Sequence, residues 1–281
     1  MSTRLGQWPD FIVIGAMKAG TTSLYRWLES QPEIWLPDVK EPNFFSDDVR
    51  WDRGVQWYQQ LFSPPSVGGT LTGEASVSYT LLSRAEIAAE RMVRVLPEAR
   101  LIYLIRHPLD RLRSHYRHEV QRNRETAAFR VALQHHATPY VGPSLYFSCL
   151  QPYIQRFGRE QICVVRSEDL FAEGPAWKAI LDFLRLPDRP PPTSRHNVTE
   201  IKRQFSPLLL RLWERGLRRL PRGVPGPARK VAKSLLTRED VNYRSLLQSS
   251  LAPIPELVEE QIWDDIQRLE SWLDLDDRLW A

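Results

Sequence analysis

Residues 11–23 read FIVIGAMKAGTTS, and the expected fold begins with this stretch. Phe11–Ile14 is a short run of β-branched and aromatic residues, which is typical of a buried strand. Gly15 and Gly20 then permit a tight turn, and apolar residues at helical spacing follow as far as about Ser30. A strand, a glycine turn and a helix N-terminus together predict an anion site, because unpaired N–H groups and the positive end of the helix dipole converge there.

The glycine spacing matches the P-loop pattern G-x-x-x-x-G-K-[ST], but the lysine is displaced. Thr21 stands where the P-loop lysine would be, Lys18 lies inside the loop, and Thr22 and Ser23 add hydroxyl donors. We therefore expect a loop that binds phosphate without the lysine that ATP-binding loops use. The alternative function is a P-loop kinase or NTPase acting on a small molecule, which would need that lysine and an acidic strand end for magnesium.

Two further apolar runs, Leu101–Ile105 and Gln161–Val165, predict buried strands. Helices are expected from Pro108 to about Asn123 and over Ala176–Leu186. Strands that alternate with helices imply crossover connections, and continuous apolar runs indicate a parallel sheet covered on both faces. The predicted fold class is α/β: a P-loop-like three-layer fold with a central parallel sheet and helices on both faces.

The C-terminal part of the chain is expected to form a helical extension packed on this fold. Four prolines within residues 187–192 predict a stiff connector, and helices are expected over Phe205–Leu220 and Glu256–Leu273. The expected organisation is one domain over residues 1–281, with a core over 9–186 and the connector and extension over 187–281.

Arg106 follows the second predicted strand, and Ser114 lies in the helix expected after it. Ser114 comes seven residues after His107, nearly two helical turns, so it is predicted to face the end of the strand. An arginine and a serine on one face can bind a phosphate, and open α/β sheets bind ligands at the carboxyl ends of their strands. The alternative is a helix that is simply basic, since it also carries Arg111, Arg113 and Arg117.

Taken together, these motifs resemble those of sulfotransferases that use PAPS, 3′-phosphoadenosine 5′-phosphosulfate. The similarity covers about residues 9–186 and is closest to the branch that includes heparan sulfate sulfotransferases and their bacterial relatives. The stretches that carry it are IGAMKAGTTSL (14–24), KEPNFF (40–45), GVQWY (54–58), GEASVSY (73–79), LIRHPLDRLRSHY (104–116) and SLY (144–146).

The resemblance implies an enzyme that moves the sulfuryl group of PAPS to a hydroxyl or amine of a carbohydrate, lipid or small-molecule acceptor and releases PAP. It implies that Arg106 and Ser114 bind the 3′-phosphate, that Glu41 is the catalytic base, and that Lys18 also stabilises the leaving phosphate. The residues implied to bind the 5′-phosphosulfate are Lys18, Ala19, Gly20, Thr21, Thr22 and Ser23.

Two carboxylates compete for the role of base. Glu41 lies in a proline-interrupted loop that can face the phosphate site, and the alternative is that it forms a surface salt bridge with Lys40. Glu74, after an expected Thr-Gly turn, is interpreted as a structural partner for a basic residue or as a helper near Glu41. Four aromatic residues could line an acceptor cleft or pack in the core: Trp51, Trp57, Tyr58 and Tyr79.

The chain departs from its presumed relatives in ways that bear on the acceptor. Ala75 and Asn43 stand where some heparan members carry lysine and histidine, and both departures weaken the case for a heparan-like acceptor. The family's late loop that closes over the nucleotide could be any of three segments: His196-Asn197, Lys202-Arg203 or Arg222–Lys233.

Composition sets the remaining expectations. The net charge is +4 over 281 residues, and the basic block Arg215–Lys233 has no interleaved aromatic residues, so no nucleic-acid partner is expected. The two cysteines, Cys149 and Cys163, favour a reduced compartment. No apolar run approaches the ~20 residues of a membrane span, and Met1–Asp10 lacks the apolar region of a secretory signal. A cytoplasmic location is expected, with no metal and no transmembrane segment; peripheral membrane contact is left open.

Overall fold

The computed structural model describes residues 8–62, 71–135, 137–171, 175–192 and 241–280. The described residues form two compact units, and each is treated by itself. The first contains the residues up to 112, those from 137 to 192 and those from 255 onward. The second contains residues 113–135 and 241–254.

The first unit is built on a sheet of five parallel strands in the order β2-β3-β1-β4-β5. β1 lies at the centre because its residues are apolar on both faces, and Phe11 to Ile14 are fully buried there. The strands are β1 (Phe11–Gly15), β2 (Ile34–Trp35), β3 (Leu71–Ala75), β4 (Arg100–Ile105) and β5 (Ile162–Arg166).

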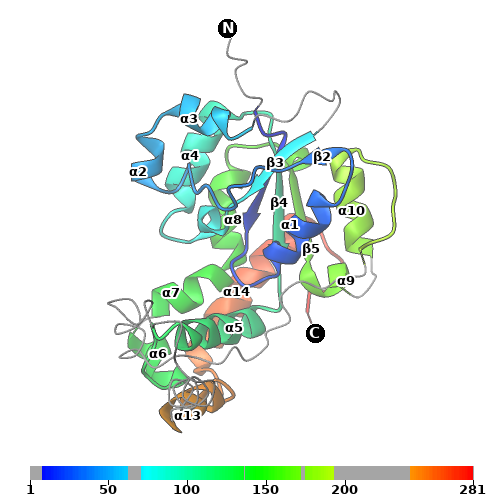
Figure 1. Ribbon diagram of the computed structural model, residues 1–281. Helices are drawn as coiled ribbons and strands as arrows, with labels where there is room; N and C mark the ends of the chain where they lie inside the picture. The colour runs from blue at the N-terminus through cyan, green and yellow to red at the C-terminus, as the bar shows by residue number, and fades with distance from the viewer. Residues whose placement is uncertain (1–7, 63–70, 136, 172–174, 193–240, 281) are drawn as a thin grey trace, which may run out of the picture. The chain divides into compact units, whose positions relative to one another are not determined.

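Helices cover both faces of this sheet, as Figure 1 shows, with α1 and α10 on one side and α4 and α8 on the other. The α-helices are α1 (Thr21–Glu29), α2 (Asp48–Trp51), α3 (Val55–Gln60), α4 (Ala85–Val95), α5 (Pro108–Gln121), α6 (Phe129–His135), α7 (Ala137–Val141), α8 (Tyr146–Ile154), α9 (Ser167–Phe171), α10 (Pro175–Leu184), α13 (Val241–Ser249) and α14 (Glu256–Leu273). Short 3-10 helices are η1 (Val77–Thr80), η2 (Gly142–Ser144) and η3 (Arg159–Gln161).

These elements confirm the predicted α/β fold class and its central parallel sheet. The predicted strands match β1, β4 and β5, and the predicted helices match α1, α5, α10 and α14 within a few residues. The predicted turn at Thr72-Gly73 is wrong, because both residues lie within β3. Gly73 pairs with Phe11 in the sheet, and a Cβ there would lie 2.3 Å from the Phe11 ring. Gly73 therefore allows the Phe11 ring to pack closely against β3. In the sequence alone, a glycine of this kind looks the same as a glycine in a turn.

α14 is joined to α8 by a buried carboxylate. Asp265 accepts hydrogen bonds from the backbone N–H groups of Phe147 (2.7 Å) and Ser148 (3.0 Å), in the first turn of α8. It thereby satisfies two of the donors that a helix N-terminus leaves unpaired. The expected helix over Phe205–Leu220 lies outside the described residues.

The second unit packs α6 and α13 around the Tyr116 side chain. The Tyr116 hydroxyl lies 3.1 Å from the Ser249 hydroxyl and donates to the Ala127 carbonyl oxygen at 2.9 Å. The Phe129 ring meets the Tyr116 ring edge to face at 5.0 Å. Arg117 donates to the Ser250 hydroxyl at 2.8 Å. Some side chains of the predicted basic helix are therefore hydrogen bonded to neighbouring backbone and hydroxyl groups.

Candidate functional site

The loop between β1 and α1 curves tightly at two glycines, and neither position has room for a side chain. Gly15 and Gly20 have positive φ angles of 155° and 100°. A Cβ on Gly15 would lie 1.9 Å from the Thr80 hydroxyl, and one on Gly20 would lie 2.8 Å from the Phe171 ring. Lys18 also adopts the left-handed region, with φ 68°. The loop conformation therefore depends on glycine at both ends.

The first turn of α1 leaves N–H groups available to a ligand. Ser23 and Leu24 donate to the Gly20 carbonyl oxygen, and Gly20 supplies no side-chain cap. Within the described part of the chain, the N–H groups of Thr21 and Thr22 donate to no protein acceptor. Unpaired N–H groups at the positive end of a helix are suited to an anion.

Lys40 connects this helix terminus to Glu41. Its ammonium donates to the Thr22 hydroxyl at 2.7 Å and lies 3.6 Å from the Glu41 carboxylate. The ion pair that was considered as an alternative role for Glu41 therefore exists, and its partner also contacts the predicted phosphate loop. Both side chains are partly exposed, at 30% and 38%, and an exposed ion pair of this kind contributes about 0–1 kcal/mol to stability. The Lys40–Glu41 ion pair therefore places Glu41 beside the predicted phosphate loop but adds little to the free energy of unfolding.

The backbone around Glu41 is held in an unusual shape. Glu41 and Asn43 both have positive φ, 56° and 52°. The Asn43 side-chain amide donates to the Glu41 carbonyl oxygen at 2.9 Å and accepts from the Ser78 hydroxyl at 2.6 Å. Asparagine tolerates the left-handed region better than most residues, so Asn43 suits its position.

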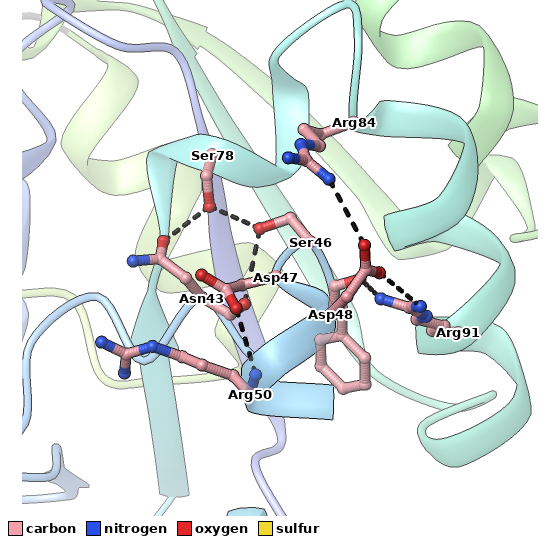
Figure 2. Close-up of polar contacts among 9 residues, drawn as sticks. Asn43, Ser46, Asp47, Asp48, Arg50, Ser78, Arg84 and Arg91 are labelled. Carbon is pink, nitrogen blue, oxygen red and sulfur yellow. Dashed lines mark hydrogen bonds and ion pairs between the residues drawn. The ribbon is translucent and has the colours of Figure 1, made fainter. Parts of the chain in front are cut away.

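The segment after Asn43 is anchored by charged side chains, as Figure 2 shows. Asp47 caps α2 by accepting from the Arg50 N–H at 3.1 Å. Arg91 of α4 pairs with Asp48 at 2.7 Å, and Arg84 lies 3.9 Å from the same carboxylate. Ser46 joins the Ser78 hydroxyl at 2.7 Å. The loop that carries Glu41 is thus fastened to α4 and η1.

Glu74 is a buried carboxylate held by hydroxyl groups. Its Oε1 accepts from the Tyr58 hydroxyl (2.7 Å) and the Tyr79 hydroxyl (2.8 Å), and its Oε2 accepts from Ser76 (2.7 Å). Desolvation raises the pKa of Glu74 to about 7, although the three hydroxyls favour the charged form, and the negative charge of Glu41 raises the pKa further. The prediction of a basic partner for Glu74 is wrong: the partners that the structure gives it are hydroxyls.

An aromatic cluster surrounds this carboxylate. Phe44, Phe45, Tyr58 and Tyr79 are fully buried, and the Phe44 and Tyr58 rings stack at 4.5 Å. Tyr58 and Tyr79 therefore belong to the core, which resolves one of the two alternatives for them. Burial and the neighbouring Glu74 raise the pKa of both phenols well above its usual value.

Trp51 and Trp57, the two tryptophans near this cluster, are only partly buried. The Arg91 guanidinium lies 4.9 Å from the Trp51 ring centre, and the Arg53 guanidinium lies 4.0 Å from that of Trp57. Each of these rings packs against a cation at the edge of the cluster.

Arg106 is held by its backbone at the end of β4. The Tyr146 hydroxyl donates to the Arg106 carbonyl oxygen at 2.7 Å. The next residue, His107, donates its N–H to Glu168 at 2.8 Å, and its ring packs edge-on against Trp263 and Trp280. His107 therefore packs against two tryptophans of the C-terminal segment. Ser114 belongs to the second unit, so the shared face of Arg106 and Ser114 stays a prediction.

Arg111, one of the arginines of the basic helix, is a buried charged residue. It is fully buried and donates to the Ser144 hydroxyl at 2.7 Å and to the Tyr140 carbonyl oxygen. Desolvation lowers the pKa of Arg111 to about 10. Arg111 therefore has a structural role within the described part of the chain, and no local pattern in the sequence distinguishes it from Arg113.

Several expectations fall outside the described residues. The three candidates for the late loop and the basic block Arg215–Lys233 all lie within residues 193–240. Among the residues that are described, no group of three His, Cys, Asp or Glu side chains could hold a metal ion. A search of the same residues finds no helix of sufficient length and apolarity to cross a membrane. Cys149 and Cys163 are both free thiols.

Comparison with known proteins identifies relatives of this arrangement. The sulfotransferase domain family model matches residues 8–206. The chain is 31% identical over 183 residues to bifunctional heparan sulfate N-deacetylase/N-sulfotransferase 4 of Mus musculus, which covers 58% of this chain and 20% of that protein. It is 29% identical over 189 residues to heparan sulfate glucosamine 3-O-sulfotransferase 6 of Mus musculus, and this match covers 64% of this chain and 53% of that protein. The chain thus spans about half the length, or less, of these curated relatives.

A solved structure matches more completely. The crystal structure of a sulfotransferase from Alicyclobacillus acidocaldarius superposes with a TM-score of 0.58 at 29% identity, over 85% of this chain and 99% of that one. The family match extends over well more than half of the sequence and contains the phosphate loop, Glu41 and Arg106. The resemblance stated from the motifs is confirmed, and the chain belongs to the sulfotransferase domain family.

Proposed function

We propose that the protein is a PAPS-dependent sulfotransferase in which Glu41 is the catalytic base. The observation that carries this proposal is the position of Lys40, whose ammonium contacts Thr22 at 2.7 Å and lies 3.6 Å from Glu41. Two motifs that are separate in the sequence, the phosphate loop and the acidic residue before the aromatic pair, meet at one ammonium group. A base beside the donor loop is what in-line transfer to an acceptor hydroxyl requires.

Residues 18–23 and the junction after β4 are proposed to bind the donor. The N–H groups of Thr21 and Thr22, which donate to no acceptor among the described residues, suit a phosphosulfate group, and Gly15 and Gly20 give the loop the curvature that presents them. Lys18 and Ala19 complete this loop, and Ser23 lies in the first turn of α1. Arg106 and Ser114 are assigned to the 3′-phosphate.

The reaction is a displacement at sulfur. The acceptor oxygen or nitrogen forms a bond to sulfur while the bond from sulfur to the phosphate oxygen breaks, and PAP leaves with the electron pair of that bond. Glu41 takes the proton from the acceptor, and Lys18 with the loop N–H groups stabilises the charge that develops on the leaving phosphate. Lys40 adds a positive charge between the two groups. These residues supply the charge stabilisation, so the proposal requires no metal.

The acceptor is proposed to be a hydroxyl- or amine-bearing carbohydrate, lipid or small molecule. Asn43 is occupied with holding the Glu41 loop, and Ala75 is buried at 1% exposure. Neither position presents a cation to an acceptor. This supports an acceptor unlike the heparan sulfate named for the curated relatives, and we retain a cytoplasmic location as part of the proposal.

The deciding experiment combines donor binding with turnover. Incubation with labelled PAPS and an extract, followed by identification of the labelled product, tests the activity and names the acceptor. Thermal stabilisation by PAP is expected, by about 2.7 kcal/mol at 100 times the dissociation constant, whereas stabilisation only by ATP with magnesium would support the kinase alternative. Arg106→Ala should weaken binding of PAP more than binding of adenosine 5′-phosphosulfate, which lacks the 3′-phosphate.

Glu41→Gln tests the base directly. Loss of a general base costs about 10²- to 10⁴-fold in rate, and PAP binding should change little. Glu29→Gln is the matched control, because Glu29 is also exposed and ion-paired, with Arg26 at 2.6 Å on α1. Near-normal turnover of Glu41→Gln would place the base elsewhere.

A further inference from the structure

The three hydroxyls on the buried Glu74 carboxylate are not equivalent. The Tyr58 and Tyr79 hydroxyls share Oε1, at 2.7 and 2.8 Å, and both phenols belong to the aromatic core. The Ser76 hydroxyl binds Oε2 at 2.7 Å. The Ser76 oxygen also accepts the Asn43 N–H at 3.0 Å, next to Glu41 in the same loop, whereas the Tyr79 phenol is hydrogen bonded to the backbone of Phe45, further along that loop.

The direction of these hydrogen bonds follows from the chemistry of a hydroxyl group. Serine has one proton to donate and two lone pairs with which to accept. Glu74 accepts the hydrogen bond that Ser76 donates, so the Ser76 lone pairs are left to face the Asn43 N–H. Without the carboxylate, the Ser76 hydroxyl would donate to another partner, and its lone pairs would no longer be held toward the Asn43 N–H.

Asn43 connects the Ser76 hydroxyl to the backbone of Glu41. Its side-chain amide donates to the Glu41 carbonyl oxygen at 2.9 Å. Both residues adopt the left-handed region, where residues other than glycine are held only by their surroundings. The direction of the Glu41 side chain therefore depends on contacts that fix this turn, and one chain of contacts begins at Glu74.

We propose that Glu74 is a positioning residue for the reaction, acting through Ser76 and Asn43 to hold Glu41 in the orientation that proton abstraction requires. The proposal rests on the proposed function, since it assigns a role relative to Glu41 as base. Glu74 does not touch the acceptor in this scheme: it is 1% exposed, and its carboxylate oxygens accept from three hydroxyls.

The test compares two variants that each remove one hydroxyl from the same carboxylate. Ser76→Ala breaks the link to Asn43, and Tyr58→Phe leaves that link intact. If Glu74 acts through Ser76, Ser76→Ala should lower kcat by about 10- to 100-fold, the loss expected from a small misplacement of a reacting group, with the KM for PAPS and PAP binding nearly unchanged. Tyr58→Phe should retain kcat within about threefold.

Asn43→Gly provides an independent variant in case Ser76→Ala fails to fold. Glycine keeps the left-handed backbone and the N–H to Ser76 but removes the amide that binds the Glu41 carbonyl oxygen. It should reproduce the loss of kcat with unchanged PAP binding. Melting temperatures of all three variants, measured with PAP, separate a loss of positioning from a loss of folding.

The possible outcomes separate the two proposals. Equal losses of kcat in Ser76→Ala and Tyr58→Phe, in step with their melting temperatures, would show that Glu74 only packs the core. Normal kcat in both Ser76→Ala and Asn43→Gly, with Glu41→Gln inactive, would overturn the positioning role and leave the proposed function intact. Normal turnover of Glu41→Gln would instead refute the base assignment on which both depend.

Discussion

The Lys40 ammonium and the Thr22 hydroxyl lie 2.7 Å apart, and this contact joins a loop to the helix terminus that precedes it by almost 20 residues in the chain. Thr22 lies in the first turn of α1, and its own N–H donates to no acceptor in the part of the chain that the structure describes. The contact therefore places a positive charge at the site proposed for the donor, 3.6 Å from the Glu41 carboxylate.

Lys40→Met should lower kcat/KM for sulfation about tenfold, equivalent to ~1.4 kcal/mol, because a charge beside the transferred group is lost. The melting temperature should stay almost constant, since exposed ion pairs add little stability. Lys178→Met is the control, because Lys178 also pairs with exposed carboxylates, Asp182 at 3.0 Å and Asp188 at 3.8 Å. Equal kinetics for the two variants would remove Lys40 from the mechanism.

Glu74 should make stability fall as pH rises through neutrality. Its pKa is about 7 in the folded protein against 4.5 for the ordinary group, so the folded state binds the proton more tightly than the unfolded state. The protonated group imposes no charge-burial penalty below pH 4.5; the penalty grows as pH rises from 4.5 to about 7 and then levels off, at a total on the order of 3 kcal/mol.

Urea unfolding of the wild type and of Glu74→Gln at pH 5 and pH 8 measures this effect. The free energy of unfolding of the wild type should drop relative to that of the variant between the two pH values. The titratable groups that act on Glu74 include the phenols of Tyr58 and Tyr79, which stay neutral in this range, and the negative charge of Glu41. A parallel pH response of the two proteins would show that Glu74 stays ionised throughout.

Gly20→Ala should weaken PAP binding by more than tenfold, because a Cβ would meet the Phe171 ring at 2.8 Å and would force the loop out of its φ of 100°. Gly54→Ala is a useful comparison. Gly54 also has a positive φ, 82°, yet a Cβ there would meet nothing within 4 Å. Isothermal titration with PAP should show loss of binding only for Gly20→Ala. Comparable losses of PAP binding in both variants would mean that backbone strain, and not the contact with Phe171, causes the loss.

Asp265→Ala should destabilise the protein by about 1–2 kcal/mol, the usual cost of losing a helix N-cap, because the Phe147 and Ser148 N–H groups lose their acceptor. Chemical denaturation measures the change. Asp264→Ala, at the exposed neighbouring position on α14, should stay within about 0.5 kcal/mol of the wild type. If both variants are equally stable, α14 does not support α8 through this carboxylate.

Local patterns were sufficient for the elements on which the donor loop is built. Phe11–Ile14 and Leu101–Ile105 are continuous apolar runs, and such a run is buried on both sides wherever the chain places it. The glycines around Lys18 define a turn through their own backbone freedom. β1, β4 and α1 could therefore be predicted without knowledge of any distant contact, whereas anion binding at their junction stays a prediction.

The roles of Glu74 and Arg111 were decided by tertiary structure, because burial and hydrogen-bond partners are properties of distant residues. Tyr58 comes 16 residues before Glu74, and Ser144 comes 33 residues after Arg111. In the sequence, one is a carboxylate beside a supposed turn and the other is one of several arginines on a polar helix. Only folding brings the hydroxyls that let each charge be buried, and only folding brings Lys40 to Thr22 and so Glu41 to the phosphate loop.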